Sequence, residues 1–101
     1  MIAVLYAERA LLDIERLTSF LLETDRAAAL VTANMLFESI HILTHSPEIG
    51  RPVTRQLQKL LYQELIVSRG RTGYVVLYRY MAAQSQVLIV NIRHQREAGY
   101  V

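Results

Sequence analysis

Apolar side chains recur through the first half of the chain at helical spacing, after one short extended segment. Residues 2–6 are almost wholly apolar and predict a strand. From residue 7 an apolar stripe begins with charged residues opposite it, and a second stripe runs from residue 26 to about residue 45. The stripe positions are Ala7, Leu11, Ile14, Leu17 and Leu21 in the first helix, and Ala29, Ala33, Leu36, Ile40 and Leu43 in the second. Asp25 is a good N-cap for the second helix, and so short a connection predicts an antiparallel helical hairpin.

The second half of the chain changes to extended periodicity. Residues 46–52, with Pro47, Gly50 and Pro52, predict the end of the helices and a turn. Strands are predicted over residues 62–67, 74–80 and 86–93, with a turn at residues 68–73, while residues 55–61 also fit one or two helical turns. The order β-α-α-β-β-β predicts one α+β domain, residues 1–101. In it the N-terminal helical hairpin packs on a curved, mainly antiparallel sheet.

Composition narrows the class of protein. Of the 101 residues 52% are hydrophobic and 20% are charged, which excludes a disordered chain and is rich in apolar groups for one small domain. We therefore expect a partner to cover an apolar surface. The chain has no cysteine, its start does not resemble a signal peptide, and no apolar run approaches the ~20 residues of a membrane helix. We expect a cytoplasmic protein that binds no membrane.

Charge is distributed unevenly. Residues 1–50 carry three arginines and seven carboxylates, a net charge of −4, whereas residues 51–101 carry eight cations and two carboxylates, a net charge of +6. Seven of those eight cations are arginine, whose planar guanidinium suits carboxylates and phosphates. This asymmetry favours an acidic partner, either a nucleic acid or an acidic protein, and a solvated basic face is the alternative.

Histidine and tyrosine patterns suggest little site chemistry outside the C-terminus. His41 and His45 have the spacing of two metal ligands on a helix, but no third ligand accompanies them, so we expect no metal and no cofactor. Tyr74, Tyr78 and Tyr80 alternate on one predicted strand, a pattern that fits sheet packing better than a base-stacking platform.

The C-terminal segment is the most suggestive cluster. Residues 91–100 carry two arginines, a histidine and a tyrosine at the end of the last predicted strand. These are groups that hold phosphate, move protons and stack on bases. A frayed polar tail is the alternative.

Four segments in this order resemble the RelE/ParE toxin superfamily: residues 47–52 (PEIGRP), 64–67 (ELIV), 73–80 (GYVVLYRY) and 90–100 (VNIRHQREAGY). The similarity extends over nearly the whole chain, including the opening strand and hairpin. It implies the toxin of a bacterial type II toxin–antitoxin system, which causes growth arrest or plasmid stabilisation and is neutralised by direct binding of a cognate antitoxin.

The superfamily divides by mechanism into ribosome-dependent mRNA endonucleases and poisons of DNA gyrase. The positions matched to the basic strand residues of the nucleases read Glu64, Ile66 and Val75, which cannot stabilise the charge of a phosphoryl transition state. The Gly50-Arg51 pair and the His94-x-Arg96 ending resemble the gyrase-directed ParE branch. We therefore favour a non-enzymatic gyrase inhibitor that does not by itself bind specific DNA sequences. The alternatives are an mRNA endonuclease and a non-toxic binding module.

The residues expected to bind the target are Arg79, Arg93, His94 and Arg96. In an endonuclease, His94, Arg96 and Tyr100 would be catalytic.

Overall fold

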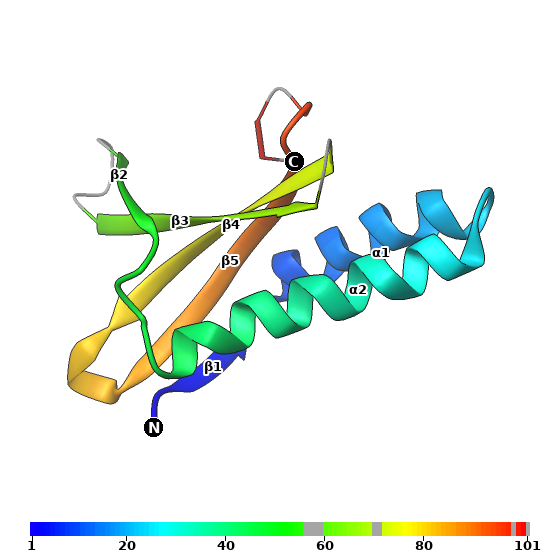
Figure 1. The fold of residues 1–101 in the computed structure, drawn as a ribbon. Helices are drawn as coiled ribbons and strands as arrows, with labels where there is room; N and C mark the ends of the chain where they lie inside the picture. Colours follow the sequence, from blue (N-terminus) through cyan, green and yellow to red (C-terminus); the bar gives the residue numbers. More distant parts are fainter. Residues whose placement is uncertain (56–59, 70–71, 98, 101) are drawn as a thin grey trace.

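The computed structural model describes residues 1–55, 60–69, 72–97 and 99–100 of the chain. Its elements are β1 (Ala3–Tyr6), α1 (Glu8–Leu22), α2 (Arg26–His41), β2 (Arg51–Arg55), β3 (Leu60–Arg69), β4 (Thr72–Met81) and β5 (Gln86–His94). Two short 3-10 turns, η1 (Ile42–Thr44) and η2 (Ala82–Gln84), follow α2 and β4. The arrangement is shown in Figure 1.

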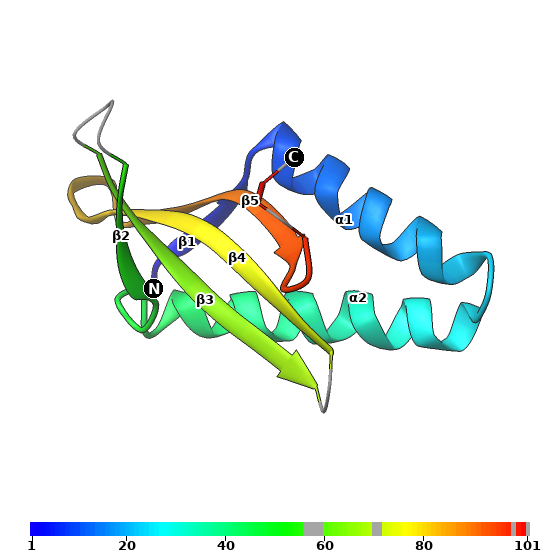
Figure 2. The ribbon, with the colours of Figure 1, turned by 90° about the horizontal axis from the view of Figure 1, so that it is seen from above.

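These strands form one mixed sheet in the order β1-β5-β4-β3-β2. β1 runs parallel to β5, and the other neighbouring strands are antiparallel. The hairpin of α1 and α2 lies along one side of the sheet, and its far end extends beyond the strands (Figures 1 and 2). The predicted α+β class, the helical hairpin and the mainly antiparallel sheet are confirmed.

β2 is a strand that the sequence pattern did not predict. The pattern indicates a turn through Pro52, whereas the structure places Pro52 within β2, opposite Gln63 of β3. Proline is tolerated there because β2 is an edge strand and needs fewer backbone hydrogen bonds. β3 is also longer than predicted and starts at Leu60. The core of the alternative helical turn, residues 56–59, and the centre of the predicted turn, residues 70–71, lie outside the described residues.

The helical hairpin follows its predicted boundaries closely, and α1 differs from its predicted apolar stripe at one position. Asp25 caps α2 as predicted, because its Oδ1 accepts a hydrogen bond from the backbone N of Ala28 at 3.1 Å. In α1 the buried residues are Ala10, Asp13 and Ile14, while Leu11, a predicted stripe position, is 51% exposed. Ile14 and Leu17 of the predicted stripe pack at the core as expected, so the pattern was wrong at Leu11 and missed the burial of Asp13.

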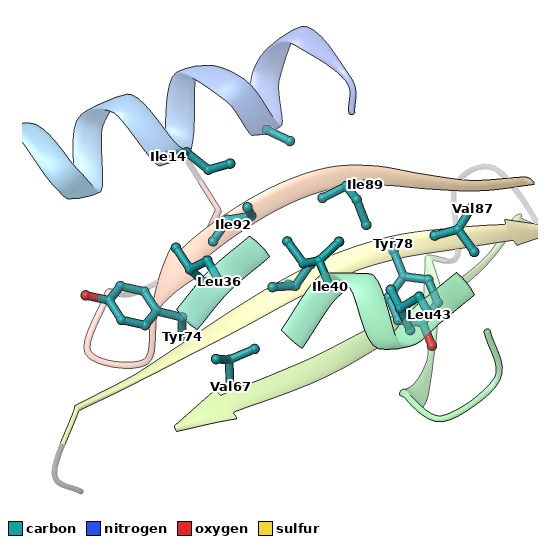
Figure 3. Packing of buried hydrophobic residues seen from close by; sticks show 12 residues of the cluster. Ile14, Leu36, Ile40, Leu43, Val67, Tyr74, Tyr78, Val87, Ile89 and Ile92 are labelled. Carbon is teal, nitrogen blue, oxygen red and sulfur yellow. The ribbon is translucent and has the colours of Figure 1, made fainter. Parts of the chain in front are cut away.

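The core lies between both helices of the hairpin, η1 and the inner face of the sheet. Fully buried side chains from the hairpin pack against those of β4 and β5, as Figure 3 shows. The central members are Leu36, Ile40, Leu43, Val76, Tyr78, Ile89 and Ile92. The expected sheet packing of the tyrosines is confirmed, since Tyr74 and Tyr78 are buried and Tyr80 packs against this core.

Gly50 joins the helical half to the sheet by a close approach to Tyr78. The backbone N of Gly50 donates to the Tyr78 hydroxyl at 2.8 Å. A Cβ at position 50 would lie 2.6 Å from that oxygen and 2.9 Å from the carbonyl oxygen of Glu64. The approach therefore requires glycine.

The helical segment Arg26–Thr44 is 19 residues long, has an 18-residue stretch of mean hydropathy 1.3, and is long and apolar enough to cross a membrane by length and composition alone. This corrects the expectation that no segment reaches that length. Core helices of globular proteins meet the same criterion. Here Leu36, Ile40 and Leu43 are fully buried against the sheet, and a lipid environment would remove those contacts.

Candidate functional site

The far half of β5 has an edge that no described strand covers, and side chains of α1 occupy it. β1 pairs only with residues 86–89 of β5. Beyond them, Asp13 Oδ2 accepts hydrogen bonds from the backbone N of Ile92 at 2.8 Å and from Asn91 Nδ2 at 3.3 Å. Arg16 Nη2 contacts the carbonyl oxygen of Ile92 at 3.4 Å. One carboxylate and one guanidinium thus replace the strand that would otherwise satisfy this backbone.

The C-terminal segment after β5 is a hydrogen-bonded turn of residues 94–97. Glu97 Oε1 accepts from the backbone N of His94 at 2.9 Å, and the backbone N of Glu97 donates to the carbonyl oxygen of His94 at 3.0 Å. The backbone N of Gln95 donates to the carbonyl oxygen of Gly73 on β4 at 3.0 Å. The alternative of a frayed tail is therefore wrong for these residues.

Glu97 also ties this turn to the helical hairpin. Its Oε2 accepts from Arg16 Nη1 at 2.8 Å, and the side chains of Arg16 and Glu97 are 36% and 26% exposed. Burial alone would raise the pKa of Glu97, but the backbone N of His94 and the Arg16 guanidinium outweigh it and hold that pKa below its usual value. The carboxylate stays charged at neutral pH.

Arg93 belongs to the architecture of the tail. Its Nη1 lies 3.3 Å from the carbonyl oxygens of His94 and Glu97, and its guanidinium lies 5.3 Å from the centre of the Tyr100 ring. Its Nε is buried without a hydrogen-bond partner in the described part of the chain. The charge of Arg93 is therefore largely directed inward.

Arg79 lies apart from the other predicted target-binding residues. It is the register partner of Leu88, whereas Arg93 is the partner of Val75, four positions before Arg79 on β4. Four strand residues span roughly 13 Å. The structure brings His94 and Arg96 together at one cleft, while Arg93 contacts the tail carbonyls and the Tyr100 ring instead and Arg79 lies apart.

The outer face of the sheet carries a buried carboxylate on β3. Glu64, 8% exposed, accepts from Arg51 through Nε at 3.1 Å and Nη2 at 2.9 Å, and from the Tyr100 hydroxyl at 2.5 Å. Burial opposes ionisation, but the Tyr100 hydroxyl and the Arg51 guanidinium outweigh it and lower the pKa of Glu64. Burial and the neighbouring carboxylate raise the pKa of Tyr100, so its hydroxyl remains a donor.

A cleft of about 530 Å³ opens between α1 and the C-terminal turn. Its lining is Arg16, Leu17, Phe20, Leu21, Tyr74, His94, Arg96 and Glu97. The wall from α1 is mostly apolar and includes Phe20, which is 71% exposed. The opposite wall is polar and includes the His94 ring, whose centre lies 5.3 Å from that of Tyr74.

A second hollow of about 440 Å³ lies under α2 and shares Leu21 and Tyr74 with this cleft. Ala28, Val31 and Met35 contribute to its lining. We call the cleft and this hollow together the hairpin groove. It lies where the hairpin extends past the sheet.

The predicted histidine pair forms no metal centre in the described residues, which contain no group of three or more histidine, cysteine, aspartate or glutamate side chains placed to hold an ion. His41 and His45 are exposed near the end of α2.

The residues that the sequence pattern did not indicate are Asp13, Arg16 and Glu97. Asp13 was visible as a polar residue at helical spacing from Ala10 and Leu17, whereas Arg16 and Glu97 are 81 positions apart and give no local signal.

Comparison with known proteins supports one family. The model of the family described as ParE toxin of type II toxin–antitoxin system, parDE, matches residues 4–99. A solved structure titled chromosomal ParDE TA system from P. aeruginosa has the same fold, with a TM-score of 0.70, 15% sequence identity and coverage of 93% of this chain and 96% of that chain. No curated protein matches the sequence. Because the family model spans nearly the whole chain, the chain belongs to the ParE toxin family of type II toxin–antitoxin systems.

Proposed function

We propose that this toxin arrests growth by binding and poisoning DNA gyrase in the cytoplasm, and that a cognate antitoxin silences it by direct binding. We choose gyrase over RNA as the target because of the negative charge on the outer face of the sheet. On this face Glu64 is an ionised carboxylate, and the hydroxyl of Tyr100, the tyrosine that could serve a nuclease, donates a hydrogen bond to it.

RNA cleavage requires cations where negative charge develops on the phosphate. At the three positions matched to the nuclease branch, Glu64 adds negative charge, Ile66 is 42% exposed and Val75 is 2% exposed. The arginines nearby are already engaged, Arg51 by Glu64 and Arg93 by tail carbonyls and the Tyr100 ring. This face is poorly suited to cleavage, which supports a binding function for the C-terminal turn.

The hairpin groove supports an antitoxin as the neutralising partner. Phe20, which lines the groove, is 71% exposed, and Val31 of its second hollow is 40% exposed. Leu30 and Leu22, elsewhere on the hairpin, are 62% and 49% exposed. Arg96 lies at the rim of the cleft, in the half of the chain with net charge +6. An amphipathic antitoxin segment with apolar and acidic residues fits this combination, and a specific interface of this kind buries more than about 1,200 Å² in total.

Inducible expression in cells tests the target. We expect growth arrest with an early DNA-damage response and filamentation, before translation falls, and relief by co-expression of the antitoxin. An empty vector is the control. Translation arrest first, with codon-phased mRNA cuts by primer extension, would assign the protein to the nuclease alternative. Normal growth at high expression would identify a non-toxic binding module.

A further inference from the structure

The turn that carries His94 and Arg96 is attached to the helical hairpin through the ion pair of Arg16 and Glu97. We propose that Arg16 and Glu97 are positioning residues, which hold this turn in the geometry that presents His94 and Arg96 to the protein target. The inference rests on the proposed function, because it concerns how the same surface is presented.

Glu97 is the centre of the arrangement because both carboxylate oxygens are used. Oε1 closes the turn on the backbone N of His94, and Oε2 fixes it to Arg16 on α1. The turn is also held to the sheet by the backbone N of Gln95, which donates to the carbonyl oxygen of Gly73, and by Arg93 Nη1, which lies 3.3 Å from the carbonyl oxygen of Glu97. Neutralising Glu97 therefore loosens the turn from within and also releases it from α1.

Arg16 is itself held in place, so the attachment is rigid. Its Nη2 lies 3.4 Å from both Asp13 Oδ1 and the carbonyl oxygen of Ile92. Asp13 is 2% exposed and is fixed by the edge of β5. The ion pair thus connects the turn to the best-packed part of α1, and a group ordered before binding does not have to be ordered during it.

The turn also sets the orientation of the imidazole. His94 Nδ1 accepts from the backbone N of Arg96 at 3.0 Å, and its ring meets the edge of Tyr74. Nε2 makes no hydrogen bond within the described residues, which leaves it for a partner. Arg96 is exposed beside it. Fixing four backbone residues therefore presents one imidazole nitrogen and one guanidinium together.

The test compares Glu97→Gln and Arg16→Met with wild-type toxin and with two matched controls, Glu15→Gln and Arg26→Met, which change exposed residues of the same types on the hairpin. The readout is the toxin concentration that gives half-maximal gyrase-dependent DNA cleavage. We expect this concentration to increase about tenfold for Glu97→Gln and for Arg16→Met and to stay unchanged for the two controls. Arg16→Lys should recover part of the loss, because an ammonium still reaches one oxygen of Glu97.

A second readout separates positioning from direct contact. Amide exchange measured by NMR at His94 should accelerate in both Glu97→Gln and Arg16→Met, while exchange in β4 stays unchanged. If Arg16→Met loses activity and Glu97→Gln does not, Arg16 contacts the target itself and the proposal is wrong. If exchange accelerates but both variants keep full activity, the ion pair does not position His94 and Arg96 for the target and the proposal is wrong. A wild-type protein without effect on gyrase would instead refute the proposed function.

Discussion

Asp13 carries the strongest stability prediction, because it is a buried charge on which the edge of β5 depends. Its Oδ2 accepts from the backbone N of Ile92 at 2.8 Å and from Asn91 Nδ2 at 3.3 Å, and the residue is 2% exposed. The substitution Asp13→Ala removes the acceptor from both donors. β1 does not extend far enough to supply a replacement.

The expected loss follows from these contacts. A buried donor left without an acceptor costs about 1–3 kcal/mol, and bonds to a charged acceptor lie toward the upper end of that range. The backbone N of Ile92 cannot turn away, whereas the Asn91 side chain, 8% exposed, can partly reach water. We therefore expect Asp13→Ala to lower the free energy of unfolding by about 3 kcal/mol, which lowers Tm by roughly 12–24 °C in a domain of this size.

Urea and thermal unfolding of the purified protein measure this loss. Asp13→Asn keeps a carbonyl oxygen for Ile92 and should lose only about half as much. Glu15→Ala, an exposed change on the same helix, should stay within about 0.5 kcal/mol of wild type. If Asp13→Ala also stays within 0.5 kcal/mol, the carboxylate does not support the strand edge and the reasoning fails.

Three further predictions concern the sheet and the tail. Gly50→Ala should lower the free energy of unfolding by about 1–3 kcal/mol in urea titrations, because its Cβ would overlap the hydroxyl of the buried tyrosine. The pKa values of Glu64 and Glu97 lie below the ordinary 4.5, so their stabilisation is complete above about pH 4.5 and is lost as pH falls through the lower folded-state values. Unfolding measured between pH 6 and pH 3 should show this decline, and Glu64→Gln should reduce it. Arg96→Ala should weaken gyrase binding about tenfold without loss of stability, whereas Arg93→Ala should also destabilise the protein by about 1–2 kcal/mol. Equal unfolding curves for the two arginine variants would contradict the inward role of Arg93.

Local periodicity predicted most of the fold. The stripe through Leu36, Ile40 and Leu43 packs on the sheet as expected, because apolar residues at helical spacing have few other ways to leave water. β2 escaped prediction because Pro52 is a turn residue in most contexts, and only the edge position of the strand makes it acceptable.

The candidate site was predicted less completely, for reasons of distance along the chain. The C-terminal cluster stood out because arginine, histidine and tyrosine lie close together in sequence. The contacts that hold this cluster could not be predicted, because Arg16 meets Glu97 and Glu64 meets Tyr100 only in the folded chain. For the same reason, the contacts of Arg93, which we expected to bind the target, with the carbonyl oxygens of its own tail could not be predicted.

We proposed that the toxin acts on gyrase and that the antitoxin prevents this. The most direct measurement incubates purified toxin with gyrase, ATP and supercoiled DNA, and quantifies the linear DNA released after protein denaturation. We predict that linear DNA increases with toxin concentration only when gyrase is present, and that an equimolar amount of antitoxin abolishes the increase. The proposal that gyrase is the target would be contradicted if no linear DNA formed at any toxin concentration and the same preparation cleaved mRNA on ribosomes in phase with codons.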